Sequence, residues 1–310
     1  MRAAMTQPVA CAPVLFLVFN RPEQTARVFE AIRQARPSRL YVAADGPRPD
    51  RPRDAQACAQ TRAIATEIDW PCQLHTLMRD FNLGCAQAVS QAITWFFEQE
   101  EEGIVIEDDC LPDASFFPYC SRLLHRYRHD QRVGQVCGFN LLPEESATYD
   151  YFASHFGWSW GWGAWRRSWS AYDRMMASWP ELKSGNFHRQ HPFYPERCRI
   201  FDAAYQRLWR ETWDYQWHYA LASQGQLSLV PSVSLVQNIG FTADATHTFS
   251  ADPRRARPAS SLPAEDDLRH PGFLLANPMY EANLIRAAHA GARRELILGK
   301  IKRLLRRLKP

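Results

Sequence analysis

The sequence predicts an α/β protein whose central sheet is mainly parallel and flanked by helices. Over the first 110 residues, short apolar runs alternate with longer segments in which apolar residues recur at helical spacing. The runs are apolar at consecutive positions, which is typical of parallel strands that are covered on both faces. Strands that alternate with helices in this way indicate a sheet built from βα units.

Four strands are predicted in this first part, and each is followed by a helix. The first strand, residues 14–19, stops at Asn20-Arg21-Pro22, where the proline suits the first turn of a helix. The next strands are expected at residues 40–44, 74–78 and 103–107, and the helices begin at Pro22, near residue 55, before Val89 and before Phe117.

The composition changes in the second half of the chain. Nine of the eleven tryptophans lie between Trp158 and Trp217, beginning in a Gly/Trp stretch at 157–165. We therefore expect a Trp-rich helical region beside the sheet. Its elements are predicted as a strand at 133–139, helices at 166–178, 196–211 and 213–223, and a strand at 227–230.

The charge of the chain is concentrated at its C-terminal end. The formal net charge is +4, but residues 293–310 hold eight Lys or Arg and one Glu, about +7, which leaves the remainder near −3. Charge therefore gives no reason to expect a nucleic-acid partner. The tail itself has an apolar stripe flanked by cations, which predicts an amphipathic helix on an anionic membrane surface; a solvated basic helix or a disordered tail is the alternative.

The cysteines and the hydropathy indicate a cytoplasmic protein, with the basic tail as a peripheral attachment at the inner face of the membrane. The eight cysteines are scattered without a Cys-x-x-Cys pair, which fits free thiols in a reducing compartment. No apolar stretch is long enough to span a membrane, and residues 1–12 are too weakly hydrophobic for a signal peptide.

Polar side chains follow each of the first four strands. Because parallel strands point the same way, we expect these side chains to meet at one edge of the sheet, where α/β proteins bind ligands. Any one of them could instead be a turn-forming Asp or a surface Arg. The residues at the strand ends are Asn20, Arg21, Asp45, Arg79, Asn82, Glu107, Asp108 and Asp109.

The acidic triplet Glu107-Asp108-Asp109 is the most informative of these groups. Three adjacent carboxylates repel one another unless a cation or donor hydroxyls share them, so a divalent metal is expected. The alternative is a strand that runs into a solvated acidic turn. No Gly-rich phosphate loop follows the first strand. We therefore expect a metal, rather than backbone amides, to hold the phosphates of a nucleotide.

Taken in order, these segments resemble the GT-A type glycosyltransferases, and more narrowly the inverting N-acetylglucosaminyltransferase I-like enzymes and their bacterial relatives. The resemblance covers residues 13–250, and the Glu-Asp-Asp segment with its following Pro and Phe-Phe is its most specific part. The Glu-Asp-Asp pattern of this segment departs from the general Asp-x-Asp motif of the fold. The matching segments are 14–21, 42–46, 79–84, 105–117, 157–165, 213–217, 238–240 and 246–248.

The resemblance implies a nucleotide-sugar donor and Mn²⁺ or Mg²⁺ as cofactor. It implies that Asp109 binds the metal while Glu107 and Asp108 face the ribose and the sugar. It also implies that His247 or Thr248 contacts the leaving diphosphate. The remaining residues that it places around the donor are Asn20, Arg21, Asp45, Arg79 and Asn82.

The resemblance places the catalytic base at Asp214, in the Trp-Asp segment that begins a helix. A carboxylate there could take the proton of an acceptor hydroxyl as it attacks the sugar. The alternative is that Asp214 is only a helix N-cap. Trp158, Trp160 and Trp162, which alternate beside glycines, are predicted to form a sugar-binding wall, since aromatic faces stack on sugars. Trp169, Trp179 and Trp209 are assigned to the core.

The sequence thus predicts an inverting, metal-dependent glycosyltransferase that moves a sugar from a nucleotide-diphosphate donor, UDP being expected, to a hydroxyl of a glycan or glycolipid. Two alternatives stay open. A sugar-1-phosphate nucleotidyltransferase would need a Gly-rich loop after the first strand, which Asn20-Arg21-Pro22-Glu23 does not supply. A non-catalytic glycan-binding module could keep the same fold.

The predicted domain organisation is a single GT-A type domain at residues 13–250. Within it, residues 13–140 would bind the nucleotide sugar and 141–250 would form the acceptor and catalytic half. Residues 251–292 are expected to be a connection with a helix, because 250–275 are rich in Pro, Ala, Arg and Asp. Residues 293–310 form the basic amphipathic tail.

Overall fold

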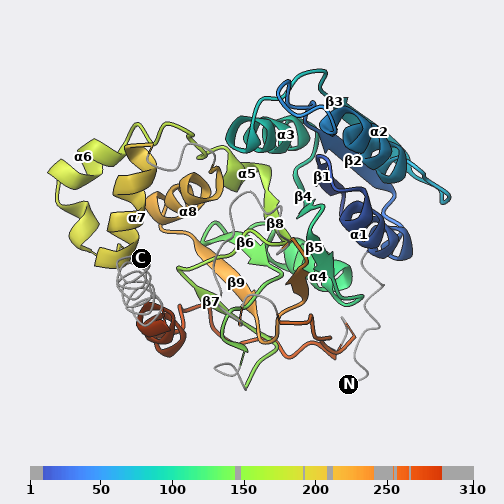
Figure 1. Ribbon diagram of the computed structural model, residues 1–310. Coiled ribbons are helices and arrows are strands. Elements are labelled where there is room, and N and C mark those ends of the chain that lie inside the picture. Colours follow the sequence, from blue (N-terminus) through green and yellow to red (C-terminus); the bar gives the residue numbers. More distant parts are fainter. Residues whose placement is uncertain are drawn as a thin grey trace, which may run out of the picture.

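The structure is a computed structural model that describes residues 10–143, 148–190, 193–207, 212–240, 254, 257–264 and 267–287. A large mixed sheet lies at its centre, with helices on both faces (Figure 1). In spatial order its strands are β3 (Gln73–Met78), β2 (Arg39–Ala44), β1 (Val14–Val18), β4 (Glu102–Glu107), β8 (Trp162–Trp165), β6 (Val133–Cys137), β9 (Leu227–Pro231) and β7 (Tyr151–Ser154).

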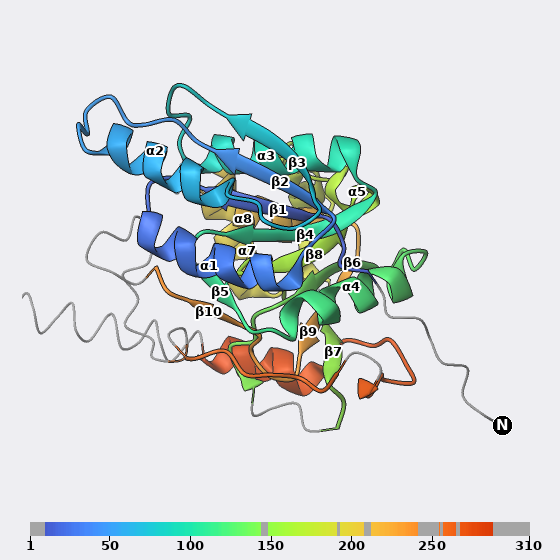
Figure 2. The same cartoon turned by 90° about the vertical axis from the view of Figure 1, so that its right-hand side faces the viewer.

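The first four strands are parallel, as predicted. Strands β1, β2 and β4 are buried along most of their length, whereas the edge strand β3 is exposed or half-buried throughout. Alternate residues of β1 point to opposite sides: Phe16 packs in one hydrophobic cluster with Phe29 of α1 (Pro22–Ala35), and Leu17 packs in another with Phe97 of α3 (Cys85–Gln99). Figure 2 shows α1 and α2 (Asp54–Ala65) on one side of the sheet and α3 on the other. Burial on both sides explains why β1, β2 and β4 are apolar at consecutive positions.

The second half of the sheet is mixed, so the sheet is mainly but not purely parallel. Strand β8 is antiparallel to both of its neighbours, β4 and β6, and β7 is antiparallel to β9. Strand β8 comes from the Gly/Trp stretch, which we expected to form a binding wall. Its small residues Gly163 and Ala164 let the strand fit between β4 and β6, where Gly163 lies against Leu124 of α4 (Phe116–Tyr127).

A second, two-stranded sheet continues from the acidic triplet. Strand β5 (Cys110–Pro112) pairs antiparallel with β10 (Val236–Asn238), with Cys110 opposite Asn238. Neither strand was predicted, because both are only three residues long. The pairing brings the residues after Asn238 next to Asp109.

The helices of the second half are shorter than predicted. The helix expected at 166–178 ends as α5 (Arg166–Trp169), because the Asp173 carboxylate accepts hydrogen bonds from the backbone N–H groups of Met175 (2.8 Å) and Ala177 (2.7 Å) and so competes with helical pairing. The others are α6 (Trp179–Ser184), the 3₁₀ turn η2 (Phe187–Arg189), α7 (Pro195–Tyr205) and α8 (Asp214–Ser223).

Residues 267–287 pack against the main body. Residues 278–287 are helical, and Tyr280 and Leu284 are buried in a cluster with Phe139 and Phe152. Ala276 forms a bridge to Ala153 of β7. Part of the expected connection is therefore built into the core.

Within the described residues, no helix is long and apolar enough to cross a membrane. The basic tail, residues 293–310, lies outside the described residues, so its contact with an anionic membrane stays a prediction.

Candidate functional site

The acidic triplet begins at the carboxyl end of β4. Strand alternation puts Val105 and Glu107 on the same face, and Val105 packs there with Trp162, Trp213 and Trp217. Asp108 follows the strand and is only 6% exposed. Its Oδ2 accepts a hydrogen bond of 3.1 Å from the backbone N–H of Phe19, at the end of the neighbouring strand β1. The triplet is therefore held by the sheet edge rather than lying in a solvated turn.

Arg21 joins the ends of β1 and β4. It precedes Pro22, the first residue of α1, and its Nη1 lies 2.6 Å from Oδ2 of Asp109 and 3.5 Å from Oδ1 of Asp108. The convergence expected from parallel strand ends is present for these three residues. One guanidinium therefore neutralises part of the negative charge of the triplet.

The triplet is nevertheless short of positive charge. Burial, and then the charges of Asp109, Asp108 and Asp214, raise the pKa of Glu107 well above its ordinary value. Burial and the charge of Asp109 raise the pKa of Asp108 to about 7, although Arg21 acts in the opposite direction. A bound cation would stabilise the ionised form of both groups.

Asp214 lies on the same side of β4 as Glu107. It is the first residue of α8, and Trp213 before it is buried and stacks on Trp162, with ring centroids 6.0 Å apart. Trp162 in turn pairs with Val105 of β4. This chain of contacts explains why the charge of Asp214 contributes to the raised pKa of Glu107.

The alternative that Asp214 is an N-cap does not match the geometry, because Trp213 occupies the N-cap position. An acid in the first helical turn suits the helix dipole. Tyr172 supports this end of α8: its hydroxyl donates to the carbonyl oxygen of Trp213 at 3.2 Å, and its ring stacks on Trp169 at 4.2 Å.

Asp45 differs from what we expected of a donor ligand. Its carboxylate, at the end of β2, accepts hydrogen bonds from four donors of the protein: the backbone N–H groups of Gly46, Leu83 and Gly84 and the side-chain amide of Asn82. These bonds occupy both carboxylate oxygens, so Asp45 and Asn82 hold the loop after β3 against the loop after β2. A contact of Asp45 or Asn82 with a donor stays a prediction.

Asn20 and Arg79 also have partners within the protein. The Asn20 amide donates to Asp54 at 3.0 Å, and Arg79 donates to Gln91 of α3 at 3.2 Å. A nearby arginine, Arg62 of α2, donates to the carbonyl oxygens of both Asp45 and Arg79 and so ties the ends of β2 and β3 together. A contact of Asn20 or Arg79 with a donor stays a prediction.

The expected tryptophan wall is wrong for Trp162. Its side chain is 0% exposed and lies among Trp169, Trp213 and Trp217, with the ring of Trp217 5.4 Å away. A ring without accessible surface cannot stack on a sugar. The reason is that the Gly/Trp stretch enters the sheet as β8, which directs Trp162 into the core.

Trp158 and Trp160 are half-buried and both contact the ring of Phe139, at 5.3 and 4.6 Å. Their role as a sugar-binding wall stays a prediction. Trp169 and Trp179 are buried in the core, as expected. Trp209, His247 and Thr248 lie outside the described residues.

The metal expected at Asp109 can be tested against the residues around it. Within the described ranges, no three His, Cys, Asp or Glu side chains are arranged to hold a metal ion. Mg²⁺ is often bound by one or two carboxylates together with substrate phosphates and water. Asp109, whose side chain is 16% exposed, fits this second arrangement. The residues therefore suit a cation that binds together with a diphosphate rather than a complete protein cage.

Sequence reasoning missed three contributors to this site. The Phe19 backbone N–H carries no side-chain signal. Tyr172 lies between the short helices α5 and α6, in a stretch whose charged residues suggest a surface position. Gly240 is the last residue of the matching segment 238–240, and no contact was predicted for it. A Cβ added to Gly240 would lie 2.2 Å from Oδ2 of Asp109. The backbone at residue 240 therefore packs directly against the carboxylate.

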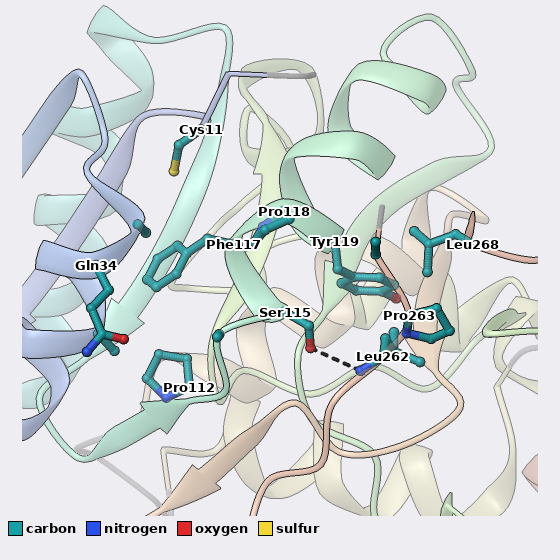
Figure 3. A pocket seen from close by; sticks show the side chains of 14 residues that line it. Cys11, Gln34, Pro112, Ser115, Phe117, Pro118, Tyr119, Leu262, Pro263 and Leu268 are labelled. Carbon is teal, nitrogen blue, oxygen red and sulfur yellow. Dashed lines mark hydrogen bonds between the residues drawn. The ribbon is translucent and has the colours of Figure 1, made fainter. Parts of the chain in front are cut away.

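A pocket of about 530 Å³ lies elsewhere, between the C-terminal part of α1, the start of α4 and residues 262–264 (Figure 3). Its walls are mainly apolar, with Ala31, Phe117 and Leu262 among them. The Ser115 hydroxyl at its edge accepts a hydrogen bond of 3.1 Å from the backbone N–H of Leu262. None of the described candidate site residues lines it, so it is separate from the acidic site.

Comparison with known proteins gives only distant similarity. No protein-family model matches the sequence, and no curated protein is similar to it. Among solved structures, HddC from Yersinia pseudotuberculosis is 11% identical over 52% of this chain and 80% of that chain, with a TM-score of 0.28. A UDP-glucose pyrophosphorylase solved with UDP-glucose is 10% identical over 51% of this chain and 78% of that chain, with a TM-score of 0.27.

Proposed function

We propose that the protein is an inverting, divalent-metal-dependent glycosyltransferase that moves a sugar from a UDP-linked donor to a hydroxyl of a glycan or glycolipid. The observation that carries this proposal is the presence of two acidic centres at the carboxyl end of β4. The first is the triplet with Arg21, and the second is Asp214 at the start of α8, where the preceding Trp213 packs in one cluster with Val105 on the face of β4 that also carries Glu107. Two acidic centres in one site allow one to serve the donor and the other to act as a base.

In this proposal Asp214 is the general base. An acceptor hydroxyl gives its proton to an Oδ atom of Asp214 while its oxygen forms a bond to the anomeric carbon. The bond between that carbon and the diphosphate oxygen breaks on the opposite face, so the configuration inverts. Tyr172 holds the start of α8 through the Trp213 carbonyl and thereby orients the base.

The triplet and Arg21 bind the donor side. Asp109 is the residue that would hold Mn²⁺ or Mg²⁺, and Glu107 and Asp108 would accept hydrogen bonds from ribose and sugar hydroxyls. When bound, the metal neutralises the charge of the diphosphate leaving group. Asp45 and Asn82 keep the loop after β3 in place beside this site.

Two isosteric variants test the two roles separately. We expect Asp109→Asn to abolish Mn²⁺-dependent binding of UDP in calorimetry and also to abolish turnover. Asp214→Asn should bind UDP and Mn²⁺ as the wild type does, while kcat falls by about 10²- to 10⁴-fold, the contribution usual for a general base. Glu30→Gln, which removes an exposed carboxylate on α1, is the control and should change neither quantity.

The alternatives predict other results. A nucleotidyltransferase would release UTP from a UDP-sugar in the presence of pyrophosphate, and a glycan-binding module would show no metal-dependent binding of UDP. Hydrolysis or transfer in a screen of nucleotide sugars identifies the donor. Wild-type turnover in Asp214→Asn would remove the assignment of the base.

A further inference from the structure

The contact between Arg21 and Asp109 leaves most of the guanidinium unused. Both carboxylate contacts are made by the same nitrogen, Nη1, at 2.6 Å from Asp109 and 3.5 Å from Asp108. Among the described residues, Nε and Nη2 of Arg21 donate no hydrogen bond. The side chain is 26% exposed, so part of it is open to solvent.

Asp109 is enclosed from the opposite direction. The backbone N–H of Ile239 donates to the Asp109 carbonyl oxygen at 2.7 Å, and Gly240 lies against the carboxylate. The Asn238 side chain fixes this turn by accepting from the Gly240 N–H at 2.8 Å. Oδ2 of Asp109 therefore has the guanidinium of Arg21 and the backbone of Gly240 as neighbours, and Arg21 occupies one of the positions from which a cation would bind this oxygen.

A guanidinium is well suited to change partners. Its planar fork binds phosphate through two parallel hydrogen bonds, which are stronger than the single-nitrogen contact seen here. A nucleoside diphosphate at this edge of the sheet would meet the unused Nε and Nη2 first. Once Arg21 turns to the phosphate, the charge that remains on Asp109 attracts a cation more strongly.

We propose that Arg21 is an internal counter-ion that makes metal binding depend on the donor: it holds Asp109 until a nucleoside diphosphate takes over the guanidinium, so that a divalent cation and the diphosphate bind cooperatively. This inference rests on the proposed role of Asp109 as metal ligand. By linkage, the diphosphate must strengthen cation binding by the same factor by which the cation strengthens diphosphate binding.

The experiment is a titration of the full chain with Mn²⁺ alone and with Mn²⁺ plus UDP, in which the free ion is followed by electron paramagnetic resonance. We expect the wild type to bind Mn²⁺ weakly alone and about 100-fold more tightly with UDP, which is within the usual range of coupling between two ligands. Arg21→Gln should bind Mn²⁺ alone about tenfold more tightly than the wild type, because a positive charge next to Asp109 is gone. The increase produced by UDP should shrink accordingly.

Two further variants separate charge from shape. Arg21→Lys keeps the positive charge and should bind Mn²⁺ alone as the wild type does, but it lacks the fork, so the effect of UDP should be smaller. Arg132→Gln removes an exposed arginine paired with Asp130 and should behave as the wild type in every titration. Circular dichroism checks that each variant is folded.

Three results would overturn the inference. If Arg21→Gln binds Mn²⁺ alone no more tightly than the wild type, while Asp109→Asn still loses Mn²⁺-dependent UDP binding, the counter-ion role is wrong and the proposed function stands. If Arg21→Lys keeps the full effect of UDP, the fork is not used on phosphate. If the wild type binds UDP without any dependence on Mn²⁺, both the proposed metal role and this inference fail.

Discussion

Asp109 owes its surroundings to three segments that are far apart in the chain. The end of β4 supplies the residue itself, the start of α1 supplies Arg21, and the end of β10 supplies Gly240. Each contact is made by a strand end or a helix start, which are the positions where side chains can leave the sheet and meet. The position of one carboxylate is therefore set by the packing of three elements.

Gly240 gives a prediction at this scale. In Gly240→Ala the new Cβ would lie 2.2 Å from Oδ2 and 2.9 Å from Cγ of Asp109, so the carboxylate has to turn away. We expect kcat/KM to fall by about 10²-fold, the loss that a displacement of 1 Å can cause in an active site. Gly272→Ala is the matched control, because a Cβ there meets nothing within 4 Å. If kcat/KM is the same in Gly240→Ala and Gly272→Ala, turnover does not depend on the position of the Asp109 carboxylate.

At the scale of the element, the helix over residues 278–287 is fixed by one buried carboxylate. Glu281 is 1% exposed and accepts hydrogen bonds from the Ser154 hydroxyl (3.0 Å), the His155 backbone (2.6 Å) and ring (3.0 Å), and the Tyr194 hydroxyl (2.8 Å). The helix is thereby joined to β7 and to the start of α7. These bonds explain why a segment expected to be a connection packs as part of the core.

The stability contributed by Glu281 should depend on pH. Burial alone would raise its pKa, but the hydrogen bonds from His155 and Tyr194 lower the pKa to about 2. Because the unfolded chain then binds the proton more tightly, the contribution is present above about pH 4.5 and is lost as the pH falls towards 2. Wild type and Glu281→Gln should differ by about 3 kcal/mol in the free energy of unfolding at pH 7.

Urea unfolding at pH 7 and at pH 3 checks this prediction, with Glu30→Gln as an exposed control on α1. The difference between the wild type and Glu281→Gln should be smaller at pH 3. A difference that stays constant between the two pH values would mean that the hydrogen bonds act without the charge.

For the whole molecule, the acidic triplet should make the protein less stable as the pH rises. Asp108 has its pKa raised to about 7 by burial and by Asp109, so the folded chain binds this proton more tightly than the unfolded chain. The stability that this proton gives is fully present below about pH 4 and is lost as the pH rises through 7.

Thermal unfolding in the presence of a chelator, between pH 5 and pH 8, measures this effect. The Tm of the wild type should fall with rising pH, and the fall should be smaller in Asp108→Asn. The fall should not disappear in the variant, because burial also raises the pKa of Glu107. Asp50→Asn, whose side chain is exposed, should follow the wild type. A fall in Asp108→Asn that is as steep as in the wild type, or steeper, would contradict the prediction.

Much of the first half of the fold could be predicted because its signals are local. The apolar runs of β1, β2 and β4 follow from burial on both faces, and the parallel direction of these strands places Arg21, Asp108 and Asp109 at one edge. The same reasoning failed for Trp162. Tryptophans that alternate with glycines are expected both in a sugar-binding wall and in a buried strand. The pairing of this segment with β4 and β6 shows that it is a buried strand.

The sequence by itself determined the α/β class, the order of the first strands and the acidic edge, because hydrophobic periodicity and strand direction act within a few residues. Only the tertiary structure decided that the sheet is mixed, that Asp45 is occupied by the loop after β3, that Asp214 lies on the face of Glu107, and that Arg21 and Gly240 enclose Asp109. These features depend on contacts between residues from 25 to more than 100 positions apart. The packing of whole elements sets such contacts, and no local pattern in the chain encodes them.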